Sequence, residues 1–221
     1  ELRFNSNLES QEIFPLVYPK VMNDLPVLNN ENRIPKEIKD SDPILAFTPD
    51  YTLKNEEYLL SFGSKSLSFE NIGEYKLWEN YFSFIKKQLY VLLELNFIQN
   101  IDRIGLRYGS LFDGEFNTNN VLLNVPSFNI EGMTENVESY RSVIKVDSET
   151  TLLLQVVSPA LAKKNGNSIS GIYIDIDASY TSDIKPNSEI FEIIERLHSL
   201  EKTLFFHLLK PSFIETLNPE Y

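Results

Sequence analysis

Two aspartates separated by a single residue, Asp175 and Asp177, are the best candidates for chemistry in this 221-residue chain. The residues around them alternate between apolar and polar, so we expect a strand with both carboxylates on one face, their Cα atoms about 6.5–7 Å apart. Such a pair can hold a hard divalent cation for hydrolysis or phosphoryl transfer. We favour the simpler interpretation of a solvated or salt-bridged strand face.

A second segment, Ile101 to Phe112, also predicts a strand, with Arg103 and Arg107 on one face and Tyr108 on the other. If this strand and the aspartate strand are neighbours in one sheet, their four charges would form a cross-strand network. Arginine and carboxylate can pair through two parallel hydrogen bonds. We rank this network ahead of a metal site, which would involve Asp175 and Asp177 if it existed.

The chain has two histidines, His198 and His207, nine residues apart on one predicted helix. At about 100° per residue they face opposite sides of the helix, so they cannot share a metal ion. His198 lies at the edge of the apolar stripe. A structural histidine is the favoured interpretation, and a binding residue is the alternative.

Other catalytic signatures are missing from the sequence. The absence of cysteine excludes disulfides, thiol catalysis and iron–sulfur clusters. The eight glycines form neither a phosphate loop nor a dinucleotide-binding motif. A Ser-His-Asp triad stays open, because its members need not be close in sequence. We therefore predict no catalytic residue and no cofactor, and lean away from an enzyme.

The charge balance limits the classes of partner. With 20 basic and 32 acidic residues the net charge is -12, which disfavours general nucleic-acid binding and anionic membranes. Residues 109–140 contain five acidic residues and no Lys or Arg. A solvated loop is the favoured interpretation, and a docking face for a basic partner is the alternative. Without cysteine or a long apolar run we expect a cytoplasmic protein, although an N-terminal segment removed by processing stays open.

The pattern of elements predicts an α+β fold. Strands are expected at 44–48, 58–62, 66–69, 101–112, 121–125, 140–146, 151–158 and 171–180. Long amphipathic helices are expected at about 74–97 and 188–209, with a short helical turn at 212–217. We expect prolines to interrupt a regular helix at 14–26, with Pro15 at a helix start as the alternative, and we expect loops at 29–43 and 159–170. Two intimately packed halves, 1–112 and 113–221, would each be an antiparallel sheet covered by one long helix, in a single compact unit.

Several segments in order resemble a family of uncharacterised, sporadically distributed prokaryotic proteins. They are Tyr75-x-x-Trp78, Arg103-x-Gly105-Leu106-Arg107-Tyr108, Ile174-Asp175-Ile176-Asp177, Leu197-His198 and the Phe205-Phe206 pair with the Leu-Lys-Pro-Ser-Phe-Ile segment after it. The resemblance spans roughly 44–217. Members commonly continue the Arg-Tyr pair with an aliphatic residue and Asn, where this chain has Gly109-Ser110. The resemblance implies no known activity, and its patchy distribution implies accessory roles in defence or toxin–antitoxin operons.

These observations lead to three hypotheses of function. The first is a non-catalytic accessory subunit that binds a protein, with a basic protein as one candidate partner, through residues drawn from Arg103, Arg107, Tyr108, Asp175, Asp177 and His198. The second is a metal-dependent hydrolase or nuclease that uses Asp175 and Asp177, with His198 or Glu195 assisting. The third is a small-ligand cup lined by Tyr and Phe between sheet and helices.

Overall fold

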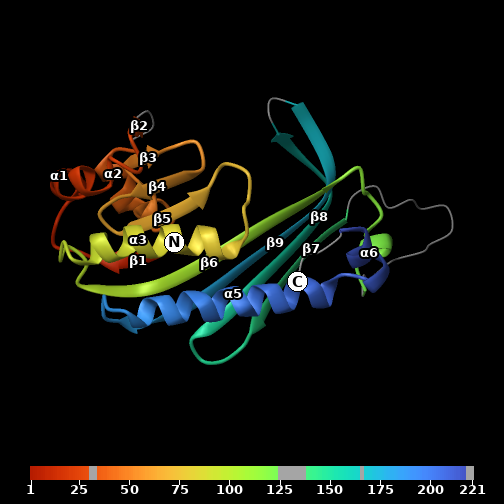
Figure 1. The fold of residues 1–221 in the computed structure, drawn as a ribbon. Helices are drawn as coiled ribbons and strands as arrows, with labels where there is room; N and C mark the ends of the chain where they lie inside the picture. The colour runs from red at the N-terminus through yellow and green to blue at the C-terminus, as the bar shows by residue number, and fades with distance from the viewer. Residues whose placement is uncertain (30–33, 124–137, 165–166, 218–221) are drawn as a thin grey trace. The chain divides into compact units, whose positions relative to one another are not determined.

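The protein has an α+β fold in which helices accompany a nine-stranded antiparallel sheet (Figure 1). A computed structural model describes residues 1–29, 34–123, 138–164 and 167–217. The strand order is β2-β3-β4-β5-β1-β6-β9-β8-β7. The predicted α+β class with antiparallel strands is therefore confirmed.

The strands and helices have the following bounds in the described residues. The strands are β1 (Leu2–Asn5), β2 (Val27–Asn29), β3 (Tyr51–Lys54), β4 (Tyr58–Phe62), β5 (Ser66–Asn71), β6 (Asn100–Asp113), β7 (Glu138–Lys145), β8 (Thr150–Lys164) and β9 (Asn167–Ile184). The α-helices are α1 (Ser10–Val21), α2 (Lys36–Ser41), α3 (Trp78–Leu93), α4 (Thr118–Val121), α5 (Glu189–Leu208) and α6 (Pro211–Thr216), and one 3-10 helix spans Leu45–Phe47.

The chain divides into two compact units, and β6, β9 and α5 contribute residues to both. Unit 1 contains Glu1–Ile104 and Thr181–Ile193. Unit 2 contains Gly105–Tyr180 and Ile194–Tyr221. Among the described residues, no helix is long and apolar enough to cross a membrane.

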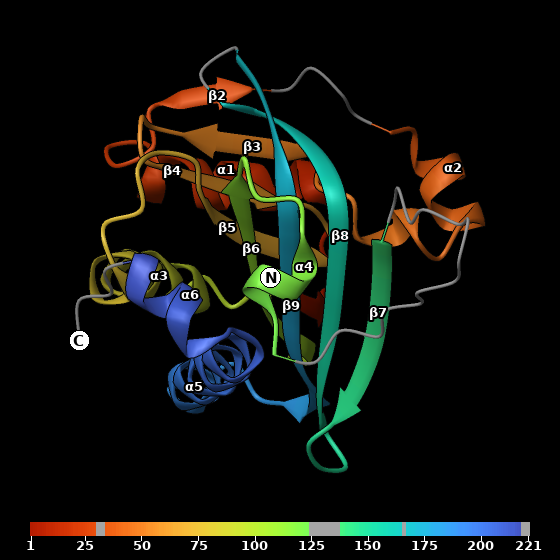
Figure 2. The same cartoon turned by 90° about the vertical axis from the view of Figure 1, so that its right-hand side faces the viewer.

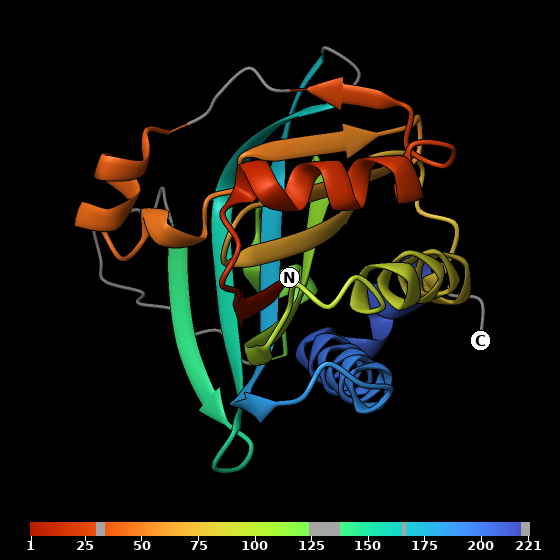
Figure 3. The same ribbon diagram turned by 90° about the vertical axis from the view of Figure 1, so that its left-hand side faces the viewer.

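In unit 1, α1 lies across β3 and β4 (Figure 3). The ring of Phe14 stacks on Tyr51 at 4.4 Å between centroids, and Tyr51 stacks on Phe62 at 5.4 Å. Alternate residues of β3, Tyr51 and Leu53, are buried, as expected for a strand with one covered face, whereas Leu60, Ser61 and Phe62 of β4 are all buried. This aromatic cluster anchors the helix to the sheet, and such ring pairs are worth about 0.5–1.5 kcal/mol beyond their buried area.

The expectation that prolines prevent a helix near the N-terminus is wrong. Pro15 and Pro19 both lie inside α1, on its exposed side. Each removes a backbone hydrogen bond, which normally destabilises a helix. The helix is retained because Ile13, Val17 and Val21, four residues apart, are fully buried in the core of the unit.

The long helix α3 of unit 1 is confirmed, but it begins at Trp78 and not at Glu74. Leu77 immediately before it has φ 73° and ψ 159°, a conformation that interrupts the helical pattern. The apolar stripe of the helix is buried as predicted, including Trp78, Phe82, Ile85, Leu89 and Leu92. The predicted strands at 58–62 and 66–69 are also confirmed as β4 and β5, which form a hairpin.

In unit 2, β7, β8 and β9 form an antiparallel meander with β7 as the outer strand (Figure 2). The predicted hairpin at 140–158 is confirmed. The loop expected at 159–170 is wrong, because β8 and β9 continue past a bulge between Val157 and Ala160 and pair again from Ala160 to Lys164. Gly171 is needed there, since a Cβ would lie 1.9 Å from the carbonyl oxygen of Phe112.

Three other segments differ from the sequence-based expectation. Residues 45–47 form a 3-10 helix where a strand was predicted, and residues 36–41 form the short helix α2 where a loop was predicted. The strand expected at 121–125 is not formed in its described part, where α4 ends at Val121 and Leu122 makes an isolated bridge to Leu209; residues 124 and 125 lie outside the described residues. These are short segments in which a few apolar residues fit either structure. The long helix α5 and the terminal α6 are confirmed.

Candidate functional site

The candidate residues in unit 2 lie on opposite faces of the same strands. Arg107 of β6 and Asp175 of β9 are in contact on one face. Tyr108 of β6 contacts His198 of α5, with ring centroids 5.9 Å apart. Arg103 belongs to unit 1, where its Nη1 donates to the carboxylate of Glu1 at 2.6 Å. Of the predicted four-charge network, the pair of Arg107 with Asp175 is formed directly.

The pair between Arg107 and Asp175 has two parallel hydrogen bonds. Arg107 Nε donates to Asp175 Oδ1 at 2.8 Å, and Nη2 donates to Oδ2 at 2.8 Å. Asp175 is buried at 6% exposure, whereas the arginine side chain is 64% exposed. Hydrogen bonding to Asp175 raises the pKa of Arg107 further above its ordinary value. The carboxylate that the metal hypothesis needs is therefore already bound by a guanidinium group.

The surface around this pair follows from the register of the strands. Arg141 of β7 is the cross-strand partner of Gln155 of β8, and Gln155 is the partner of Asp175. These residues with Arg107 and Asp177 are called the ion-pair face below. Arg141 is exposed and Gln155 half-buried, so the face is partly open to solvent. Arg141 has no ion pair within the described part of the chain.

The glycine at position 109 has a steric basis. A Cβ at Gly109 would lie 2.3 Å from the hydroxyl oxygen of Tyr173 and 2.9 Å from its ring. The Tyr173 ring therefore occupies the space that an aliphatic side chain at position 109 would fill. Tyr173 belongs to β9 and is half-buried.

On the opposite face, α5 carries a buried carboxyl group that sequence reasoning missed. Glu201 is 2% exposed, and neither carboxyl oxygen completes a hydrogen bond within the described residues. Burial, with the charge of Asp177 adding to it, raises the pKa of Glu201 to about 9, although the backbone amides of Tyr108 and Ala178 lie near enough to oppose this shift. The group is therefore protonated and neutral at pH 7.

The sequence did contain a signal for Glu201. It lies four residues after Leu197 and three before Leu204, which is a stripe position of the amphipathic helix. Charged residues are rarely buried, so a glutamate at a predicted core position is a signal of a buried polar group. His198 is half-buried one turn before it, while His207 is exposed, as the predicted opposite orientation requires.

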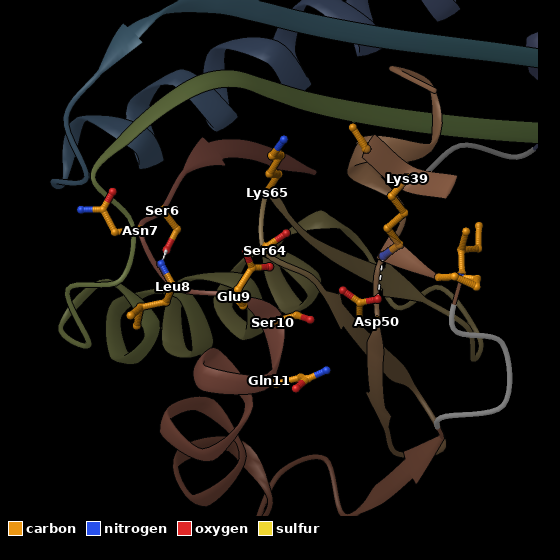
Figure 4. A pocket seen from close by; sticks show the side chains of 13 residues that line it. Ser6, Asn7, Leu8, Glu9, Ser10, Gln11, Lys39, Asp50, Ser64 and Lys65 are labelled. Atoms are coloured by element: carbon orange, nitrogen blue, oxygen red, sulfur yellow. Dashed lines mark hydrogen bonds and ion pairs between the residues drawn. The ribbon is translucent and has the colours of Figure 1, made fainter. Parts of the chain in front are cut away.

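Unit 1 contains a pocket of about 680 Å³ beside the start of α1 (Figure 4). Lys39 on its wall is 8% exposed, and its Nζ donates to the carbonyl of Thr48 and to Asp50 Oδ1, both at 2.6 Å. The remaining wall is mostly polar, with Ser6, Ser10 and Ser64. No Tyr or Phe lines it, so this pocket is not the aromatic cup suggested by the sequence.

The acidic segment 109–140 is described only in part. Glu131 and Glu135 lie outside the described residues. Asp113 is exposed, and Glu138 accepts a hydrogen bond from the buried Thr118 hydroxyl. Among the residues that the structure describes, no group of three or more His, Cys, Asp or Glu could hold a metal ion.

Comparison with known proteins gives no match of any kind: no family model, no curated protein and no solved structure matches the chain. The resemblance to a sporadically distributed prokaryotic family is therefore carried only by the motifs quoted above. Function has to be argued from the chemistry of the residues.

Proposed function

We propose that the protein is a non-catalytic accessory subunit that binds a basic protein. The observation that carries this proposal is the two-bond ion pair of Asp175 with Arg107. In this pair the carboxylate of Asp175, the best candidate for chemistry, is bound by another side chain of the protein. A guanidinium fork satisfies both carboxylate oxygens and competes with any cation for them.

The charge of the chain supports a basic partner. Its net charge of -12 attracts basic surfaces and repels polyanions. The resemblance to a patchily distributed prokaryotic family supports an accessory role in a defence or toxin–antitoxin operon. The candidate binding residues remain Arg107, Asp175 and Asp177 on the ion-pair face, with Tyr108 and His198 beneath it and Arg103 in unit 1.

The test is affinity purification of the tagged full chain from its native cells, followed by reconstitution with the recombinant partner. We expect a stoichiometric complex with a protein of high isoelectric point, and an affinity that falls as salt is raised. A chain that remains monomeric under native conditions and binds none of its neighbours in the operon would reject the proposal.

The alternative is a metal-dependent hydrolase or nuclease that uses Asp175 and Asp177. Calorimetric titration with Mg²⁺ and Mn²⁺ separates the two, because a cation at this pair must displace Arg107. Saturable heat that disappears in Asp177→Asn, together with hydrolysis of a phosphodiester, would establish the alternative instead.

A further inference from the structure

The segment between β5 and α3 presents large apolar side chains to solvent. Ile72 is 46% exposed, Tyr75 is 47% exposed and Leu77 is 57% exposed, all within six residues. Isolated exposed apolar residues are ordinary, but a group of them in one short segment is typical of an interaction surface. The three residues are called the 72–77 patch.

The patch is held in place by the turn between β3 and β4. The backbone amides of Ile72 and Gly73 donate to the carbonyl oxygen of Glu57 at 2.9 and 3.1 Å. Lys76 forms an ion pair with the Glu57 carboxylate, and Asn80 Nδ2 donates to the Lys76 carbonyl at 2.6 Å. A Cβ at Gly73 would lie 3.0 Å from the Glu56 carbonyl oxygen, so the two segments are closely packed. The patch is therefore preorganised by contacts within unit 1.

The backbone of Leu77 is strained, and its side chain is the most exposed of the three in the patch. Its φ of 73° and ψ of 159° lie in a region that is essentially restricted to glycine. A leucine there raises the free energy of the folded state, and an exposed side chain recovers little of this by burial. Strain of this kind is common at binding sites, which gives a reason to seek a contact that uses the side chain.

Carboxylates surround the apolar side chains. Glu56, Glu70, Glu74 and Glu79 are exposed in the turn, in β5, in the patch segment and in the first turn of α3. Glu70 and Tyr75 both act electrostatically on Tyr81, and Glu74 acts on Lys76. The ammonium of Lys76 is paired with Glu57. The rim is therefore acidic, and its complement is a basic surface.

We propose that the 72–77 patch docks a basic protein segment that carries aliphatic side chains. The apolar residues would contact the aliphatic groups, and the glutamates of the rim would contact Lys or Arg around them. This inference rests on the proposed function and names the surface and the partner chemistry for it. It assigns this contact to unit 1, in addition to the candidate binding residues named above.

The test uses the single tryptophan of the chain, Trp78, which follows Leu77 directly. A tryptophan-free amphipathic peptide of leucine and lysine is titrated into the full chain, and the Trp78 emission is followed. We expect a saturable change, and an affinity that falls about tenfold between low and high salt. A lysine-only peptide of equal charge and a leucine–glutamate peptide serve as comparators and should bind at least about tenfold more weakly.

The variant pair is Leu77→Gly and Ile44→Ser. Leu77→Gly removes the apolar side chain and also relieves the strain, so its melting temperature should match or exceed that of the wild type. We expect about tenfold weaker peptide binding for Leu77→Gly. Ile44 is 84% exposed elsewhere in unit 1, and its replacement should leave the affinity unchanged.

Three results would overturn the inference: no saturable binding, equal affinity for the lysine-only peptide, or full affinity of Leu77→Gly. The native complex separates this failure from that of the proposed function. If Leu77→Gly binds the native partner with wild-type affinity, the proposed function stands and the patch is rejected as the docking surface. If the wild type binds no native partner, the proposed function is rejected. The peptide titration then still tests whether the patch binds a basic, aliphatic segment.

Discussion

Unit 2 contains two carboxyl groups, Asp175 of β9 and Glu201 of α5, that are buried to a similar degree but compensated differently. Asp175 is 6% exposed and accepts two hydrogen bonds from Arg107. Glu201 is 2% exposed and completes none within the described residues. The first is compensated by a neighbouring cation, and the second is compensated by a proton, because burial raises its pKa to about 9.

The difference teaches that burial alone does not fix the state of a carboxyl group. A charge removed from water must be paired and hydrogen-bonded, or else it is neutralised. The ion-pair face is partly open, and a long arginine can reach an aspartate from solvent there. Beneath α5 the neighbours of Glu201 include Tyr108 and Ala178, which supply no cation. The stability of unit 2 should therefore depend on pH through Glu201.

The largest predicted effect concerns Glu201→Leu. Since the pKa is about 9 in the folded protein and ordinarily 4.5, the folded state keeps a proton that the unfolded state releases between these values. The free energy of unfolding then falls as pH rises through this window, by up to about 1.4 kcal/mol per pH unit. Glu201→Leu removes this dependence, so it should gain about 2–4 kcal/mol on the wild type between pH 5 and pH 8.

Urea denaturation of both proteins at pH 5, 6.5 and 8 measures this difference. Glu192→Leu, at an exposed position of the same helix, is the matched control and should show a difference from the wild type that does not vary with pH. Parallel curves for Glu201→Leu and the wild type would mean that Glu201 is ionised at neutral pH and has found a partner.

The next effect concerns Asp175, the carboxylate that is paired with a cation. Arg107→Ala leaves Asp175 buried without its cation, and we expect a loss of about 1–3 kcal/mol in the free energy of unfolding at pH 7. The lower end allows for the exposure of the arginine, which weakens the pair through solvent screening. Arg141→Ala on the same face, without an ion pair in the described residues, should change stability by less than about 0.5 kcal/mol.

A double-mutant cycle isolates the pair itself. Arg107→Ala, Asp175→Asn and the double variant should show a coupling of about 1–2 kcal/mol in chemical denaturation. Additive effects would show that Asp175 is stabilised by its surroundings and not by Arg107. The contrast with Glu201 would then disappear.

The smallest effect links the two faces. Asp177 is the principal charge that raises the pKa of Glu201 besides burial. Asp177→Asn should therefore lower the pKa of Glu201 toward its ordinary value. Titration of ¹³C-labelled glutamate by NMR measures the shift directly. An unchanged pKa would assign the whole effect to desolvation.

Sequence periodicity predicted the elements that follow one clear pattern. The stripes of α3 and α5 and the alternation in β6 and β9 identified these elements, and alternation also placed Ile172, Ile174 and Ile176 on the buried side. It failed where tertiary contacts override local preference. Pro15 and Pro19 remain helical because their helix buries one face, and residues 160–164 remain extended because their partner strand continues beside them.

The sequence predicted that Arg107 and Asp175 could pair, but not that Asp175 would be buried. Shared strand faces identified Arg107 and Asp175 as potential partners. Alternation assigned Asp175 to the outer face and gave no reason to expect 6% exposure. Arg103 was grouped with Arg107 by spacing alone, and spacing gave no sign of its hydrogen bond to the Glu1 carboxylate, about a hundred residues earlier. Contacts of that range depend on strand order, which periodicity does not encode.

The first strand of the chain has a consequence for how the polypeptide is made. β1 lies between β5 and β6, so Leu2 pairs with both Leu67 and Ile104. A ribosome must therefore deliver a hundred residues before the first five acquire both neighbours. During that interval the nascent chain carries an unpaired strand edge, which a chaperone would have to shield from other chains.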